Sequence, residues 1–243
     1  MRRVTCHELL DDDLGTPQEV ASNLDDLWRI NRWLGGVSSN MAMLGRFLSS
    51  TRLRRVRVLE VGAGDARLTA ALRDQLSRRG VEADFFVLDR RSSHLAHGSP
   101  LALGLRAVAA DALSLPFPEN SFDLVTCNLL FHHFSGDEAQ AFMQQLARVA
   151  RRAVLINDLE RHLLPYLFTL GTFWLMRSRL SRHDAPASVR QAYTREELVA
   201  LARAAGFADF EVRRLAPFRL GLTLWKTPVE PALHVTQGLE NFA

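Results

Sequence analysis

The turn Gly62-Ala63-Gly64 has the residue types of a ligand-binding loop. It follows an apolar run over residues 56–61 and precedes a helical pattern with leucines at positions 68, 72 and 76. Such a turn lets a ligand approach the backbone closely, and the amides that open the next helix point toward it. The Glu60 carboxylate beside the turn would repel a pyrophosphate, but it would suit a ligand with an ammonium and a sulfonium group. These residues therefore favour S-adenosylmethionine as the ligand.

Polar residues also end the apolar runs that follow. Asp89 ends the run over residues 85–88, Asp111 follows a weaker run over 105–109, and Asn128 follows the run over 122–127. Taken separately, Asp89 could be a helix cap and Asp111 a turn residue. In a parallel sheet, however, ligands bind at the carboxyl ends of the strands, so these residues together predict one binding site.

The apolar runs and the helical patterns alternate along the chain. Further strands are predicted over residues 153–156, 210–215 and 218–225. Three helices are predicted to start with a capping box, Thr16-Pro17-Gln18-Glu19, Ser135-Gly136-Asp137-Glu138 and Thr194-Arg195-Glu196-Glu197. This alternation predicts the α/β class, with a doubly wound and mainly parallel sheet.

The segment Val58 to Asp65 resembles motif I of the class I (Rossmann-like) S-adenosylmethionine-dependent methyltransferases. The Leu115-Pro116-Phe117 segment and Ser121-Phe122-Asp123 are similar to the family's approach to the fourth strand, and the resemblance covers about residues 53–225. It departs from many members at Ala66, where they have a third glycine. The resemblance implies a Rossmann-like seven-stranded sheet whose last strand is antiparallel, with S-adenosylmethionine as cofactor and S-adenosylhomocysteine as product. It also implies these cofactor-binding residues: Glu60, Gly62, Ala63, Gly64, Asp89 and Arg90 near the first two strands, and Asp111, Ala112, Asn128 and Leu129 near the next two.

Two adjacent histidines, His132 and His133, follow the strand over 122–127, beside the expected methyl group. A phenol, with an unperturbed pKa near ~10, gains from a base that removes its proton. We predict that His133 is this base. Adjacent side chains are expected to point different ways, so at most one of the two faces the acceptor, and either could instead hold the turn by bonding to backbone. His183-Asp184 is the runner-up, as a second base with its orienting carboxylate or, as we favour, a solvated polar turn.

The segment over residues 158–193 is too long for a simple connection. We predict that it caps the acceptor pocket, although its aromatic stripe would equally suit core packing. The predicted acceptor contacts are Tyr166 and Trp174 in this segment and Trp28 and Arg32 in the N-terminal helices. The predicted organisation is an N-terminal helical lid (1–52), a methyltransferase domain (53–225) that includes the cap, and a C-terminal tail (226–243).

Two further segments, over residues 26–36 and 182–190, resemble bacterial methyltransferases that accompany polyketide synthases. This resemblance implies an enzyme of secondary-metabolite biosynthesis that methylates a phenolic oxygen of a small aromatic or polyketide-like acceptor. Methylation of carbon and a quinone-type acceptor stay open. An NAD-dependent oxidoreductase is disfavoured by Glu60 and by Arg67, which stands where a dinucleotide fingerprint has glycine. A cofactor-binding protein without catalysis is the remaining alternative.

Composition excludes several other classes. The 243 residues have a formal net charge of +3, and the arginines are scattered among carboxylates, which argues against a nucleic-acid partner. There are only two cysteines, and the pair Cys6-His7 is too isolated for a metal site, so neither a disulfide framework nor a metal site is expected. The longest apolar stretch, residues 163–176, is shorter than the roughly 20 residues that a membrane span needs, so we expect a cytoplasmic protein without stable membrane insertion. That stretch could still rest on a membrane surface to take up a lipid-like quinone. A monomer and a homodimer are both open.

Overall fold

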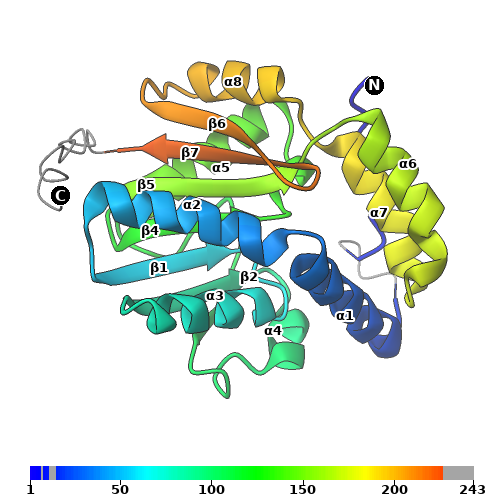
Figure 1. Ribbon diagram of the computed structural model, residues 1–243, viewed down its shortest axis with the longest axis horizontal. Helices are drawn as coiled ribbons and strands as arrows, with labels where there is room; N and C mark the ends of the chain where they lie inside the picture. Colours follow the sequence, from blue (N-terminus) through cyan, green and yellow to red (C-terminus); the bar gives the residue numbers. More distant parts are fainter. Residues whose placement is uncertain (7, 11–14, 227–243) are drawn as a thin grey trace, which may run out of the picture.

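A seven-stranded sheet forms the centre of the computed structural model, which describes residues 1–6, 8–10 and 15–226 (Figure 1). The strand order is β3-β2-β1-β4-β5-β7-β6. The strands are β1 (Arg55–Val61), β2 (Glu82–Asp89), β3 (Arg106–Ala109), β4 (Phe122–Asn128), β5 (Ala150–Leu159), β6 (Phe210–Leu215) and β7 (Arg219–Trp225). Strands β1 to β5 pair in parallel, and β7 is antiparallel to both β5 and β6. The predicted Rossmann-like sheet with its last strand antiparallel is therefore confirmed.

Eight α-helices and two short 3₁₀ helices surround this sheet in the described residues. They are α1 (Pro17–Trp33), α2 (Gly36–Thr51), α3 (Arg67–Arg78), α4 (Ser92–Gly98), η1 (Phe131–His133), α5 (Gly136–Val149), α6 (Leu163–Thr172), η2 (Phe173–Leu175), α7 (Arg179–Gln191) and α8 (Arg195–Ala204). Helices α2, α3 and α4 bury their apolar sides in one core cluster, and α5 and α8 bury theirs in a second. The sheet is thus covered on both faces, as parallel sheets require.

The position of a ligand site follows from the strand order. Chain connections run in opposite directions from β1 and β4, which are neighbours at the centre of the sheet. This reversal leaves a crevice at the carboxyl ends of the central strands, where doubly wound proteins bind ligands. Helices α1, α6 and α7 stand together at one end of the molecule (Figure 1).

The two parts of the predicted N-terminal lid pack differently. Helix α2 belongs to the core, because Met43, Leu44 and Phe47 are buried in the cluster on one face of the sheet. Phe47 also stacks on Trp225 of β7, with ring centroids 6.2 Å apart. Helix α1 instead packs against α7, the last helix of the predicted cap.

Two of the three predicted capping boxes are confirmed. In α1 the Thr16 side chain accepts from the Glu19 amide and Glu19 accepts from the Thr16 amide, and Thr194 and Glu197 do the same in α8. The third was wrong, since the Ser135 side chain makes no capping hydrogen bond although its backbone is extended, as an N-cap requires.

The predicted polar turn at His183-Asp184 was also wrong, because both residues lie inside α7. Of the predicted C-terminal tail, only Lys226 belongs to the described residues. No helix in the part of the chain that the structure describes is long and apolar enough to cross a membrane.

Candidate cofactor and acceptor site

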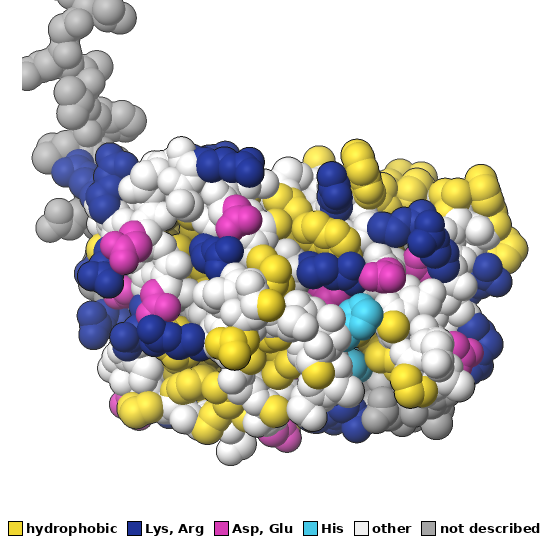
Figure 2. All heavy atoms as spheres, turned by 90° about the horizontal axis from the view of Figure 1, so that it is seen from below, with side chains coloured by type: hydrophobic (Ala, Val, Ile, Leu, Met, Phe, Trp, Pro, Cys, Tyr) yellow, Lys and Arg dark blue, Asp and Glu magenta, His cyan; other side chains and the backbone are white. Residues whose placement is uncertain are grey.

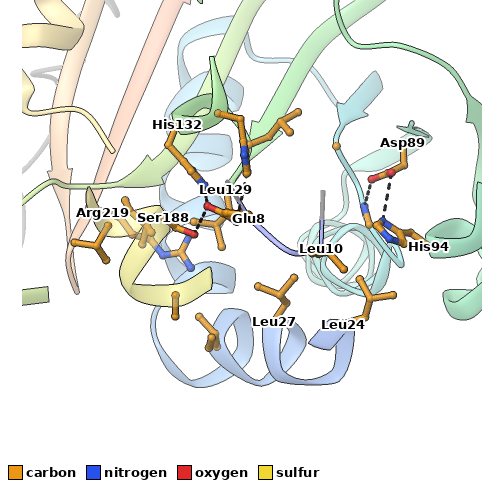
Figure 3. A pocket seen from close by; sticks show the side chains of 18 of the residues that line it. Glu8, Leu10, Leu24, Leu27, Asp89, His94, Leu129, His132, Ser188 and Arg219 are labelled. Atoms are coloured by element: carbon orange, nitrogen blue, oxygen red, sulfur yellow. Dashed lines mark hydrogen bonds and ion pairs between the residues drawn. The ribbon is translucent and has the colours of Figure 1, made fainter. Parts of the chain in front are cut away.

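A cavity of about 470 Å³ lies at the carboxyl ends of β1, β2 and β4 (Figure 3). This volume is within the roughly 300–1,000 Å³ of typical small-molecule sites. The strand-end residues and helices α1, α6 and α7 enclose it. Nine predicted site residues line it: Gly62, Gly64, Asp89, Arg90, Asp111, Ala112, Leu129, His132 and His133.

The glycine turn is shaped by its backbone. Gly62 and Gly64 have φ of +75° and +55°, the left-handed region that favours glycine. A Cβ on Gly62 would lie 2.5 Å from Cδ2 of Leu130, so a side chain has no room there. Ala66, where many family members have the third glycine, also has a positive φ of 61°. The backbone at Ala66 therefore has the left-handed conformation that favours the glycine found there in many family members.

Asp89 ties the glycine turn to the end of β2. One carboxylate oxygen accepts from the Gly64 amide at 2.8 Å, and the other accepts from the Arg91 amide at 2.9 Å. The His94 Nδ1 atom lies 3.6 Å from the second oxygen (Figure 3). The carboxylate is thus fixed at the cavity wall, where its remaining lone pairs can accept hydrogen bonds from two neighbouring hydroxyls.

Three predicted cofactor residues, Glu60, Ala63 and Asn128, lie outside the cavity lining. Glu60 is buried, and its carboxylate accepts from the Thr69 hydroxyl. Burial raises the pKa of Glu60 to about 7, against the opposing effect of the Thr69 hydrogen bond. The buried Asn128 side chain accepts from Asn40 at 2.9 Å. In this arrangement Glu60 bonds to Thr69 and lies behind the cavity lining.

The N-terminal segment brings an unpredicted carboxylate, Glu8, to the two histidines. Its Oε1 atom accepts from the Ser188 hydroxyl at 2.7 Å and lies 3.4 Å from Nε2 of His132 (Figure 3). On the other side of the His132 ring, Nδ1 lies 2.8 Å from Asp158, which also accepts from the His132 amide at 2.9 Å. His132 is therefore held between two buried carboxylates.

These carboxylates decide the charge of His132. Burial by itself lowers the pKa of this histidine, but Asp158 and Glu8 outweigh it and raise the pKa from 6.5 to about 10. Burial likewise raises the pKa values of Glu8 and Asp158, and the interactions with His132 overcome that effect and lower both. At neutral pH His132 is an imidazolium between two carboxylates, so it has no nitrogen lone pair with which to accept a proton.

His133 lies in the same group. Its Nε2 atom is 3.9 Å from the second Glu8 oxygen, and its ring centroid is 4.2 Å from that of His132. Both residues lie in the 3₁₀ helix η1. Both histidines line the cavity, and which of the two faces an acceptor stays a prediction.

The acceptor side of the cavity is lined by other residues of α1 and α6 than those predicted. Trp28, Arg32, Tyr166 and Trp174 all lie outside the lining. The inward positions of α6 are Pro165, Phe168, Thr169 and Thr172, which share one helical face. The inward positions of α1 are Leu24, Leu27 and Ile30, followed by Leu34 just after the helix. The two helices were thus predicted correctly, but not the faces that line the cavity. The prediction selected the aromatic residues instead of the residues that the helical spacing places on one face.

His183 is exposed and also lies outside the cavity lining. Its neighbour Asp184 is buried, and burial raises the pKa of Asp184 despite the hydrogen bond from His183. The two Asp184 oxygens accept from the amides of Leu9 and Leu10, at 2.9 and 3.2 Å. Asp184 therefore fixes the segment that carries Glu8, which is a different role from the predicted orientation of a base.

Glu8, Asp158 and Arg219 are among the residues at the site that sequence reasoning missed. Asp158 lies near the end of β5, so the strand-end rule that found Asp89 could have found it. Arg219 opens β7, is 1 % exposed, and donates to Asn31 at 3.2 Å and to Asn128 at 3.4 Å. Burial lowers its pKa to about 10, even with Asp158 acting in the opposite direction. No sequence pattern marked Glu8 or Arg219.

Glu8, His132 and His133 also have the donor types of a metal site. One atom from each lies within 4.8 Å of the others, the single such group among the residues that the structure describes. His132 favours an ion network over a metal site, because its pKa is raised to about 10 and a charged imidazole offers no lone pair to a metal.

Comparisons with known proteins agree with this geometry. Residues 58–153 match the family described as a methyltransferase domain. A demethylmenaquinone methyltransferase of Roseiflexus sp. (strain RS-1) is 33 % identical over 178 residues, 65 % of this chain and 70 % of the relative. The ubiquinone/menaquinone biosynthesis C-methyltransferase UbiE of Stenotrophomonas maltophilia (strain R551-3) is 27 % identical over 178 residues, 65 % of this chain and 68 % of the relative. The crystal structure of the plantazolicin methyltransferase BpumL shares the fold, with a TM-score of 0.65 at 13 % identity over 86 % of this chain and 90 % of that one.

The chain belongs to the class I S-adenosylmethionine-dependent methyltransferases. It is an enzyme, and its cofactor is S-adenosylmethionine. The cavity fits this cofactor, because the open glycine turn and the fixed Asp89 carboxylate stand at its edge beside Asp111.

Proposed function

We propose that the enzyme methylates a phenolic hydroxyl oxygen of a small, largely apolar aromatic acceptor. The observation that carries this proposal is the composition of the acceptor side, where leucines of α1 face Pro165, Phe168 and Met176. An aromatic ring gains roughly 25 cal/mol per Å² of apolar area buried there, whereas a highly charged acceptor would lose its hydration. A nucleic acid is disfavoured as acceptor for the same reason.

The cofactor, when bound, supplies an electrophilic methyl group to a nucleophile aligned with its sulfonium. Asp89 would accept hydrogen bonds from the ribose hydroxyls of the bound cofactor, and the glycine turn with Arg90, Ala112 and Leu129 would form the rest of the cofactor side. Apolar residues of α1 and α6 exclude water and hold the acceptor ring in line. In this arrangement residues 158–193 act as the cap, with α1 as its partner across the cavity.

His133 takes the phenolic proton in this mechanism. His132 is already protonated at neutral pH, with a pKa of about 10, so it cannot serve as this base. Glu8, 3.9 Å from His133 Nε2, stabilises the imidazolium that forms there. General-base catalysis of this kind contributes ~10²–10⁴-fold in rate.

Methylation of a ring carbon is the second candidate. The names of two relatives, a C-methyltransferase of ubiquinone/menaquinone biosynthesis and a demethylmenaquinone methyltransferase, support it. Both reactions need the same deprotonated phenol, because a phenolate is nucleophilic at oxygen and at its ring carbons. The orientation of the ring then selects the product. The segments over residues 26–36 and 182–190 support a polyketide-derived ring as the acceptor.

An acceptor panel tests the proposal. Phenols, polyketide-derived rings, reduced quinones, an oligonucleotide and a peptide are incubated with the cofactor, products are found by mass spectrometry, and the methylated atom is assigned by NMR. We expect an aromatic acceptor methylated on oxygen. A ring-carbon product would replace the first candidate with the second, and a nucleic acid or a peptide as the preferred acceptor would refute both.

A further inference from the structure

The outer face of helices α6 and η2 is a continuous apolar surface. The members of this face are Leu163, Leu164, Leu167, Leu170, Phe173, Trp174 and Leu175. Trp174 is 66 % exposed and Leu164 is 61 % exposed, and no charged residue interrupts the segment over 163–176. Single exposed apolar residues are common on proteins, but a contiguous patch of this kind marks a binding surface.

The same helix separates this surface from the cavity. Pro165, Thr169 and Thr172 of α6 face inward and line the cavity, while Leu164 and Leu167 lie on the exposed outer face. Phe168 lies between the two, since it lines the cavity, is 37 % exposed and packs on Phe218 with ring centroids 5.7 Å apart. The outer apolar surface and the acceptor side of the cavity are therefore opposite sides of the same helix, with Phe168 at the boundary between them.

Positive charge follows directly after the apolar segment. Arg177, Arg179 and Arg182 are all exposed, and Arg182 donates to the Met176 carbonyl at 3.0 Å, which holds its side chain at the end of the patch. Arg179 is partly neutralised by Glu19 at 3.0 Å. Figure 2 shows apolar side chains gathered at the end of the molecule where Figure 1 places α6, with arginine side chains next to them. An apolar face bordered by arginines is typical of segments that lie in the headgroup region of anionic membranes.

We propose that the outer face of α6 and η2 binds the surface of a lipid bilayer that contains anionic phospholipids. The helix has 10 residues, too few to cross a bilayer, so it lies in the plane of the headgroups with its leucines and Trp174 directed into the acyl region. From this position an apolar acceptor could pass from the bilayer into the cavity. That passage rests on the proposed function, whereas the binding of this surface to lipid is independent of it.

A second copy of the chain suits this surface less well than a bilayer. A symmetric dimer pairs this patch with itself, and the segment over 163–176 has no carboxylate to meet Arg177 and Arg182 at its border. Anionic headgroups instead provide the opposite charge at the border of the patch.

Vesicle flotation tests the proposal with the full chain and no acceptor. The vesicles contain phosphatidylcholine alone or phosphatidylcholine with about one-third phosphatidylglycerol. The test variant is Leu164→Ser/Leu167→Ser/Phe173→Ser, whose three positions lie outside the cavity lining. The matched control is Leu101→Ser, because Leu101 is 86 % exposed but lies far along the chain, between α4 and β3.

We expect the wild type and Leu101→Ser to float with the anionic vesicles, and the triple variant to bind at least ~10-fold less. Arg177→Gln/Arg182→Gln should bind less to anionic vesicles and show a weaker dependence on salt. Unaltered circular dichroism and S-adenosylhomocysteine binding will show that the triple variant is folded.

Failure of the wild type to float, or equal flotation of the triple variant, would overturn the proposal. A dimer in light scattering that the triple variant abolishes, without vesicle binding, would assign the surface to a second copy. Because neither measurement uses an acceptor, a failure here is distinguishable from a negative acceptor panel.

Discussion

The charge on His132 makes a quantitative prediction about stability and pH. Its pKa rises from 6.5 to about 10 in the folded protein, so the fold holds this proton more tightly than the unfolded chain does. The stabilisation is fully present below about pH 6.5 and is lost as the pH rises through about 10. At ~1.36 kcal/mol for each pKa unit, the free energy of unfolding should fall by up to about 5 kcal/mol across that range.

The perturbation is His132→Gln, which keeps a polar side chain but removes the charge between Glu8 and Asp158. We expect it to lower the free energy of unfolding by a few kcal/mol near pH 6, because two buried carboxylates lose their cation. The difference from the wild type should shrink toward pH 10, where the wild type loses the same charge. Urea unfolding at about pH 6, 8 and 10 measures both proteins, with the exposed His183→Gln as control. A difference that is constant with pH would refute the assignment of a charged His132.

Three other perturbations test other parts of the site. Asp89→Ala should weaken S-adenosylhomocysteine binding in calorimetry by about 1–3 kcal/mol, since charge-assisted hydrogen bonds are lost, and wild-type affinity would contradict its role. Gly98→Ala should lower the melting temperature and weaken cofactor binding, because the new Cβ would lie 1.7 Å from the Asp65 carbonyl oxygen beside the glycine turn. An unchanged melting curve would contradict this, since it would show that the loop can move aside. Prolonged EDTA treatment should leave turnover unchanged, because charged His132 offers no lone pair to a metal, and a loss that Zn²⁺ or Mn²⁺ restores would establish a metal at the histidine pair.

Local patterns in the sequence predicted most of the fold. Apolar runs that end in Gly62, Asp89 and Asn128 mark β1, β2 and β4, because a buried parallel strand must be apolar and its carboxyl end must be polar where a ligand binds. The capping boxes of α1 and α8 were found for a similar reason, since both partners lie within four residues of each other.

The rest of the site depends on contacts between residues far apart in the chain. Helix α7 holds Glu8 beside His132, because Asp184 accepts from the amides of Leu9 and Leu10 and Ser188 donates to Glu8. No local pattern encodes a pairing over that separation. The inward face of α6 was missed for another reason. Pro165, Thr169 and Thr172 have the helical spacing of a lining face, but they are less conspicuous than Tyr166 and Trp174, which point elsewhere.

The most direct test of the account is the single-turnover rate of methyl transfer in His133→Asn, measured with the preferred acceptor of the panel. Since His132 is already protonated, no neighbouring histidine can replace the lost base. We predict a rate at least ~10²-fold below the wild type, with S-adenosylhomocysteine affinity unchanged. A wild-type rate in His133→Asn would contradict the account, because the acceptor would then lose its proton without the base on which the proposed mechanism depends.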